Sequence, residues 1–143
     1  MADCTRELVI QALQAVLDTA LAAAYGTAYR ITRNPSFDPK QIPNGTILLG
    51  IYEGAAPPPE NGNVQLFLSV PVLLTTRVAA AASEGEYLQQ RLNNAEAIVL
   101  AALMSINLVA AGRTVGMEVT GMARDVGQLE MWSDITLTLT FPA

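Results

Sequence analysis

The closing segment of the chain has the most regular pattern in the sequence. Apolar and polar residues alternate there, with Ile135, Leu137, Leu139 and Phe141 against Asp134, Thr136, Thr138 and Thr140. Successive side chains of a β-strand point to opposite faces, so this pattern predicts a strand with one buried and one polar face. Such a strand requires a second layer of structure over its apolar face.

Four more strands are predicted from similar patterns. They span residues 27–33, 46–53, 64–78 and 115–124, and the closing strand covers 130–141. Proline-containing loops are expected at 34–45 and 54–63. Pro71 donates no ladder hydrogen bond, so the 64–78 strand is expected to lie at a sheet edge there or to carry a bulge. Polar residues at 125–128 predict the turn of a closing hairpin.

The first of two predicted helices covers residues 4–25, where apolar residues recur at helical spacing. Asp3 or Thr5 is expected as its N-cap, because a short polar side chain accepts a bond from a free amide of the first turn. Gly26 is expected to end the helix in the left-handed conformation.

The second helix is predicted from about residue 84 to 111, with a Ser83–Glu86 capping box at its start and Gly112 at its end. Its core face is expected to consist of Leu88, Leu92, Ala95, Val99, Leu103 and Ile106. A second apolar stripe is formed by Ala97, Leu100, Met104 and Leu108, where charged residues would normally face water. Either a loop or the first helix covers this stripe, or another subunit does.

The element order predicts an α+β fold. Two helices are expected to pack on one face of a mainly antiparallel sheet of about five strands, in the order α-β-β-β-α-β-β. The length of 143 residues suits one domain over residues 1–143, and 51% apolar residues supply its core. The apolar content exceeds what this single core would use.

Composition excludes several kinds of chemistry. The chain has no histidine, which removes zinc sites and Ser-His catalysis, and Cys4 alone forms no internal disulfide. Eight basic against 13 acidic residues give a net charge of −5, which disfavours binding to nucleic acid or acidic lipid. The acidic pair Glu84 and Glu86 is explained by capping, and the acidic cluster of Asp125, Glu130 and Asp134 by a solvated turn. No phosphate-binding glycine motif is present. We therefore expect no catalytic, cofactor or metal site, and a protein that is not an enzyme.

The N-terminus has acidic residues where a secretory signal would have basic ones, and the apolar stretch 95–111 is interrupted by polar residues. We expect neither export by that route nor a membrane span, and hence a soluble intracellular protein.

The layout resembles the tail-terminator, or tail-completion, proteins of long-tailed bacteriophages. The residues that carry the resemblance are Leu8 to Tyr25, V-Q-L-F-L-S-V-P-V-L-L-T-T-R at 64–77, E-Y-L-Q-Q-R-L-N-N-A-E-A-I-V-L at 86–100, and W-S-D-I-T-L-T-L-T-F at 132–141. They cover nearly the whole chain, in the order of an opening helix, a long strand, an alanine-rich helix and a closing hairpin.

The resemblance implies a structural virion protein of the tail or neck, assembled in the host cytoplasm. Such proteins form a hexameric ring that caps the growing tail tube, stops its polymerisation and meets the head connector. The implied partners are copies of the chain, the tail tube protein and head–tail connector proteins, with DNA passing through the lumen without specific binding. Phe37, Ile42 and Tyr52 would then contact the tube or connector. Trp132 is either an interface anchor or an outer-face residue under a loop.

Two other functions stay open. One is another neck or head–tail connector component of related fold. The other, from a different class, is a small ligand-binding or enzymatic α+β domain. Its pocket would lie on the sheet face away from the helices, lined by Thr136, Thr138, Thr140, Glu118 and Arg124.

Overall fold

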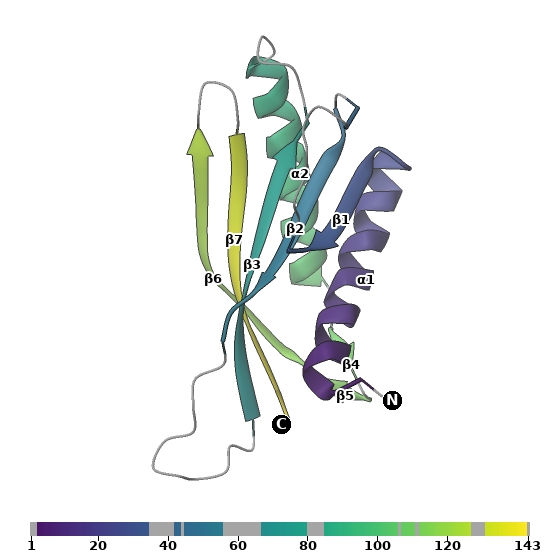
Figure 1. The fold of residues 1–143 in the computed structure, drawn as a ribbon, viewed down its shortest axis with the longest axis vertical. Helices are drawn as coiled ribbons and strands as arrows, with labels where there is room; N and C mark the ends of the chain where they lie inside the picture. The colour runs from purple at the N-terminus through teal and green to yellow at the C-terminus, as the bar shows by residue number, and fades with distance from the viewer. Residues whose placement is uncertain are drawn as a thin grey trace.

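The computed structural model describes residues 3–34, 42–43, 45–55, 67–79, 85–105, 107–110, 112–126 and 131–142. In chain order its elements are α1 (Thr5–Tyr25), β1 (Tyr29–Arg33), β2 (Ile47–Glu53), β3 (Phe67–Val78), α2 (Gly85–Ser105), β4 (Val109–Ala110), β5 (Arg113–Thr114), β6 (Gly116–Val126) and β7 (Met131–Pro142). A five-stranded sheet forms one layer and the two helices form the other (Figure 1). The predicted α+β class is confirmed.

The large sheet has the strand order β1-β2-β3-β7-β6. Three of its four pairings are antiparallel, as predicted, but β1 and β2 run parallel. Strands β3 and β7 are the central pair, joined over eleven register positions from Phe67↔Pro142 to Arg77↔Trp132. The outer strands β1 and β6 leave one edge each without a neighbouring strand in the described sheet.

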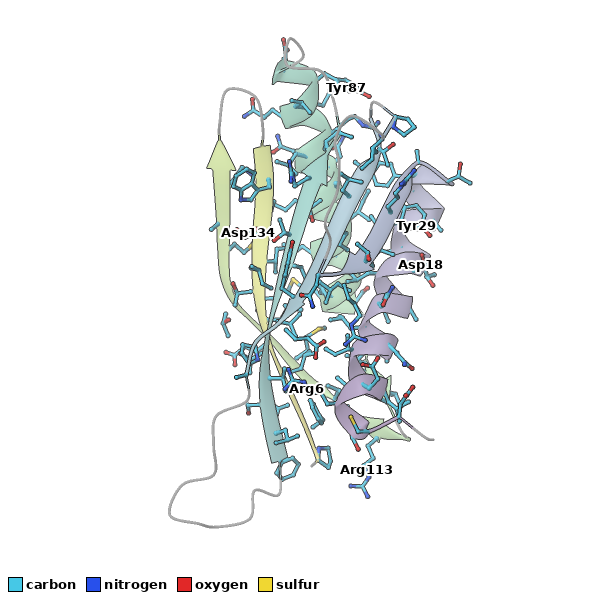
Figure 2. The ribbon with its side chains drawn as sticks, viewed as in Figure 1. Arg6, Asp18, Tyr29, Tyr87, Arg113 and Asp134 are labelled. Carbon is cyan, nitrogen blue, oxygen red and sulfur yellow. The ribbon has the colours of Figure 1, made fainter. Side chains whose placement is uncertain are left out.

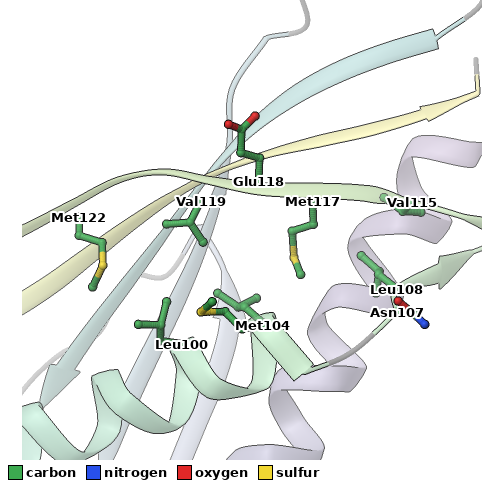
Figure 3. A pocket seen from close by; sticks show the side chains of 10 residues that line it. Leu100, Met104, Asn107, Leu108, Val115, Met117, Glu118, Val119 and Met122 are labelled. Atoms are coloured by element: carbon green, nitrogen blue, oxygen red, sulfur yellow. The ribbon is translucent and has the colours of Figure 1, made fainter.

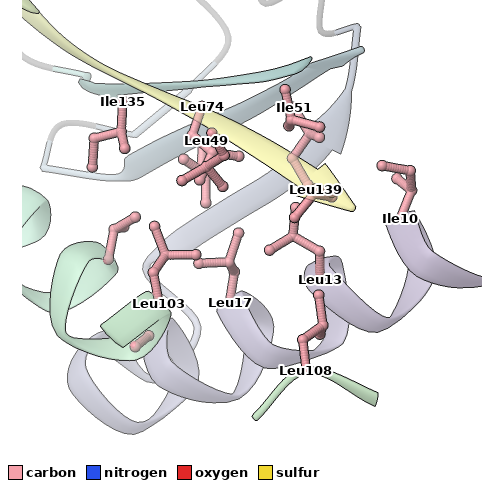
Figure 4. Packing of buried hydrophobic residues seen from close by; sticks show 14 of the residues in the cluster. Ile10, Leu13, Leu17, Leu49, Ile51, Leu74, Leu103, Leu108, Ile135 and Leu139 are labelled. Carbon is pink, nitrogen blue, oxygen red and sulfur yellow. The ribbon is translucent and has the colours of Figure 1, made fainter. Parts of the chain in front are cut away.

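A single main core lies between the helices and the sheet (Figure 4). Five residues of α1 point into it, namely Val9, Ile10, Leu13, Leu17 and Leu21. The apolar side of the closing strand faces them, because Ile135, Leu137, Leu139 and Phe141 are all buried. The alternation seen in the sequence is therefore confirmed. The predicted core face of α2 is also confirmed at Leu88, Leu92, Ala95, Val99 and Leu103, and its sixth member, Ile106, lies outside the described residues.

Helix α1 is long and apolar enough to cross a membrane by length and composition alone. In this fold one face of the helix packs against the sheet, because its five buried residues belong to the main core. The N-cap prediction was wrong: Cys4 occupies that position with no side-chain cap bond, and Asp3 instead accepts a hydrogen bond from Gln11 at 2.9 Å. Gly26 ends the helix, as predicted, with φ +64°, but its ψ of −111° lies outside the predicted left-handed helical region.

Helix α2 is shorter than predicted. It ends at Ser105, and the chain then forms the small β4–β5 hairpin, in which Gly112 adopts φ +74°. Leu108 is 4% exposed and belongs to the core, and its carbonyl accepts a bond from the Val115 amide at 2.8 Å. Tertiary burial of Leu108 thus overrides the helical spacing that the sequence continues past Ser105. The capping residue Ser83 lies outside the described residues.

Pro71 lies where β3 loses its neighbour on one side. The register of β2 with β3 ends at Glu53↔Val72, while β7 continues beside Pro71. The Gly54 amide donates to the Pro71 carbonyl at 2.8 Å, so the proline nitrogen faces the side on which β2 has ended. Pro71 therefore lies one position past the last β2–β3 register pair, which agrees with the predicted edge only locally, because β3 itself is an inner strand.

An ion network joins the start of α1 to the ends of β1 and β2. Arg33 donates to Glu7 and Glu53, each at 2.5 Å, and Arg6 donates to Glu53 at 3.0 Å and to the Gly54 carbonyl at 2.7 Å. Arg6 is near the N-terminal end of α1 in Figure 2. Bonds from the guanidiniums therefore tie three elements together at their ends.

Candidate functional site

A groove of about 630 Å³ lies between the C-terminal half of α2 and the edge strand β6 (Figure 3). Its lining is mainly apolar and consists of Leu100, Leu103, Met104, Asn107, Leu108, Val115, Met117, Glu118, Val119 and Met122. Met104 from α2 is 76% exposed and Met122 from β6 is 50% exposed. We call this surface the α2–β6 groove.

A β-bulge in β6 determines which side chains line the groove. The register passes from Val119↔Leu137 to Gly121↔Thr136, which leaves Thr120 without a register partner. Met117 and Val119 precede the bulge and Met122 follows it, yet all three line the groove. Without the extra residue, the strict alternation of a strand would place Met122 on the opposite face from Val119.

The same bulge brings Arg124 to the helix side. Its guanidinium donates to Glu96 at 2.9 Å and to Asn93, both on α2. Buried Ser133 of β7 also donates to Glu96. Burial acts to raise the pKa of Glu96, but the bonds from Ser133 and Arg124 outweigh it and hold the pKa below its usual value. An ionised Glu96 thus fixes α2 to β6 and β7 beside the groove.

This contact contradicts the pocket expected on the far face of the sheet. Arg124 and Glu118 have the same parity in the sequence, but the bulge separates them: Glu118 pairs with Thr138 and is exposed, whereas Arg124 contacts α2. The five residues of the alternative pocket therefore do not lie on one face of the sheet.

Only part of the predicted second stripe of α2 lies on the surface. Ala97 and Met104 are exposed and Leu100 is half-buried, so these three remain on the outside of the helix. Leu108 is not on the helix and is buried, so its place in an exposed stripe was wrong. Three of the four, Leu100, Met104 and Leu108, line the α2–β6 groove.

The other candidate contact residues lie apart from the groove. Ile42 is 9% exposed and packs with Leu48 and Ala79 in a small separate cluster. Tyr52 is half-buried on β2. Trp132 is half-buried on β7, with the Arg77 guanidinium 5.8 Å from its ring centre. Phe37 lies outside the described residues.

The β6 wall of the groove was missed by the sequence analysis. Met117 and Met122 are five positions apart, which in an uninterrupted strand places them on opposite faces. Gly121 between them was the available signal, because glycine inside a strand often marks a bulge.

Within the ranges that the structure describes, no three potential ligand side chains lie close enough together to hold a metal ion. Asp134 accepts a hydrogen bond from Thr75 at 2.9 Å across the β3–β7 pair. The residues Glu84 and Glu130, named in the two acidic groups, lie outside the described ranges.

Comparison with known proteins gives distant structural likenesses. No family model and no curated protein matches the sequence. A structure of the bacteriophage SPP1 gp17 protein is similar over 92% of this chain and 89% of its own, with 16% identity and a TM-score of 0.45. A second solved structure, of a protein without a functional name, covers 99% of this chain and 100% of its own, with 17% identity and a TM-score of 0.49. The case for a function therefore rests on the chain's own residues.

Proposed function

We propose that this chain is a structural protein of a bacteriophage tail or neck that assembles with copies of itself into a ring. The observation that carries the proposal is the α2–β6 groove, an apolar surface that the monomer leaves open to water. Exposed apolar surface of this kind marks contacts with other proteins. We infer the kind of assembly from the element order of the chain, which resembles that of tail terminators.

The finer role that we propose is tail capping. A hexameric ring of this chain would end the growing tail tube, stop its polymerisation and present its other face to the head connector. A ring closes through head-to-tail contacts, in which two different patches of each subunit meet. The α2–β6 groove would provide one patch.

Charge supports a passage for DNA through such a ring. Each chain carries −5, so six copies carry about −30. Like charge repels the phosphate backbone, so DNA would move through the lumen without being retained.

The experiment that tests the proposal is to add purified protein to polymerising tail tubes and measure tube length, with negative-stain images of the protein alone and with tubes. We expect tubes of reduced length capped by a ring. Met104→Glu places a charge on the groove and should abolish capping, because burying an unpaired carboxylate in an apolar contact is costly. Gln90→Glu adds the same charge at another exposed position of α2 and should leave capping intact.

Unchanged tube length with the natural chain would refute tail capping. Rings that form without an effect on tube length would instead favour another neck or connector component. A monomer at all concentrations whose thermal stability rises with a small apolar compound would favour the ligand-binding alternative, because 630 Å³ lies in the usual range of ligand pockets.

A further inference from the structure

A second hollow, of about 400 Å³, lies between the C-terminal end of α1 and the middle of α2. Its lining consists of Ala24, Tyr25, Arg91, Asn94, Ala97 and Ile98. Ala24, Asn94 and Ala97 are exposed, so the hollow opens to the surface. We call it the Arg91 pocket. It shares no lining residue with the α2–β6 groove.

Arg91 is held in a fixed orientation within this pocket. Its Nη2 donates to the Gly45 carbonyl at 2.5 Å, and its Cζ lies 5.5 Å from the ring centre of Tyr25 and 5.6 Å from that of Tyr87. Tyr87 is at the N-terminal end of α2 in Figure 2. Gly45 allows this close approach, because a Cβ there would lie 3.0 Å from the Tyr87 hydroxyl and 3.7 Å from Arg91 Nε. One hydrogen bond and cation–π contacts with two aromatic rings thus hold the guanidinium in place.

The charge of Arg91 has no carboxylate partner within the described ranges of the chain. Arg6 and Arg33, which are half-buried like Arg91, and the exposed Arg124 each donate to a glutamate. Among the described residues, Arg91 donates a hydrogen bond only to a neutral carbonyl, through one of its three nitrogens. In a chain with an excess of acidic residues, a fixed guanidinium without a carboxylate is an open position for an anion.

Two polar atoms at this site also lack hydrogen-bond partners. Both Arg91 Nε and the Tyr25 hydroxyl are shielded from solvent and have no hydrogen-bond partner in the part of the chain that the structure describes. Burial raises the pKa of Tyr25, and the charge of Arg91 opposes this, so the hydroxyl stays protonated and able to donate. Both groups are donors, and donors that are buried without an acceptor are costly. A single acceptor with two oxygens, reached by a small adjustment of the rings, would satisfy them together.

We propose that the Arg91 pocket binds a carboxylate carried on a short aliphatic stem. The carboxylate oxygens would accept from Arg91 and Tyr25, with the Asn94 amide as a further donor at the mouth. The methyl and aliphatic side chains of Ala24, Ala97 and Ile98 would pack against the stem. This chemistry is offered both by a small organic acid and by a glutamate side chain of a partner protein.

The test is a nuclear magnetic resonance titration of the full chain with sodium propionate, which carries a carboxylate on a two-carbon stem. We expect saturable shifts of the Arg91 Nε–H and Asn94 side-chain signals, and none with sodium chloride at equal ionic strength or with propionamide. Tyr25→Phe keeps the aromatic ring beside Arg91 but removes the hydroxyl, and should weaken binding about tenfold. Arg91→Lys should abolish the Asn94 shift, whereas Arg113→Lys, an exposed arginine elsewhere, should not.

A glutamate blocked at both backbone ends distinguishes the two sources of the carboxylate. Saturation by this compound, but not by blocked glutamine, would assign the pocket to a side chain of a partner. Saturation by propionate alone would assign it to a small acid. The proposal is overturned if propionate gives no saturable shift, if propionamide acts equally, or if Tyr25→Phe, which needs no change in Arg91, binds as tightly as the natural chain.

Discussion

At the scale of single residues, Gly54 has almost no space for a side chain. A Cβ on Gly54 would lie 2.6 Å from Cγ of Pro71, whose ring is fixed by its own backbone. The Gly54 amide bonds to the Pro71 carbonyl at 2.8 Å, so the two chains cannot separate without losing that bond. We expect Gly54→Ala to lower the free energy of unfolding by about 1–3 kcal/mol, measured by chemical denaturation.

Gly116→Ala is the matched control for this substitution. Its Cβ would meet Thr140 at 3.5–3.6 Å, which is ordinary van der Waals contact. We expect a change within about 0.5 kcal/mol. Equal losses for the two variants would contradict the steric explanation, and recovery of stability in a Gly54→Ala, Pro71→Ala double variant would support it.

The ion network at the start of α1 predicts sensitivity to acid. Burial acts to raise the pKa of Glu53, but hydrogen bonds from Arg33 and Arg6 outweigh it and hold the pKa below 4.5; the bond from Arg33 likewise lowers the pKa of Glu7. A carboxyl with a depressed folded-state pKa stabilises the fold above its unfolded pKa, and this stabilisation is lost as the pH falls through the folded value. We expect the free energy of unfolding to decrease below about pH 4.5. Chemical denaturation at a series of pH values from 3 to 7 measures this.

Glu53→Gln should be less stable than the natural chain at pH 7 but lose less stability between pH 5 and pH 3. Glu118→Gln, at an exposed carboxylate without an ion pair in the described network, should keep the natural acid dependence. If the acid profile of Glu53→Gln matched that of the natural chain, the network would not be the source of the pH dependence.

At the scale of elements, the sequence predicted the helices and strands whose apolar pattern repeats many times. The closing strand alternates over eight residues, and burial of one face leaves no other register for it. The end of α2 was not predictable from spacing, because Leu108 continues the helical period while its side chain enters the core from the β4 segment. The parallel pairing of β1 with β2 is set by the route of the chain, about which local patterns carry no information.

Only one of the two walls of the α2–β6 groove was predictable from the sequence. The α2 wall follows from helical spacing, but the β6 wall depends on one unpaired residue, Thr120, whose effect is to reverse the faces of everything after it. A pattern search that assumes strict alternation therefore assigns Met122 and Arg124 to the wrong side.

Deletion of Thr120 should turn one half of β6 over. Either Met122 and Arg124 leave the helix side, or Met117 and Val119 do, because a strand without a bulge alternates strictly. We expect a loss of about 2 kcal/mol or more in the free energy of unfolding, since the first outcome removes the bonds from Arg124 to α2 and the second exposes apolar side chains.

Thr120→Ala keeps the extra residue and removes only the 3.3 Å bond from its hydroxyl to the Thr136 carbonyl, so it should change stability by less than about 1 kcal/mol. A deletion as stable as this variant would mean that the bulge does not determine the two faces of β6.

At the scale of the whole molecule, an exposed groove makes stability depend on concentration. Burial of Met104 and Met122 between copies would stabilise only the folded, associated chain, so mass action raises the apparent melting temperature as the protein concentration increases. For a chain of this size we expect a rise of roughly a few degrees for each tenfold increase, measured by scanning calorimetry over a hundredfold range. Met104→Glu should melt near the temperature of the dilute natural chain at every concentration, because its groove no longer associates while its core is untouched. Gln90→Glu should follow the natural chain. A melting temperature independent of concentration in the natural chain would mean that copies of it do not cover the groove, and its partner would then have to be a different protein.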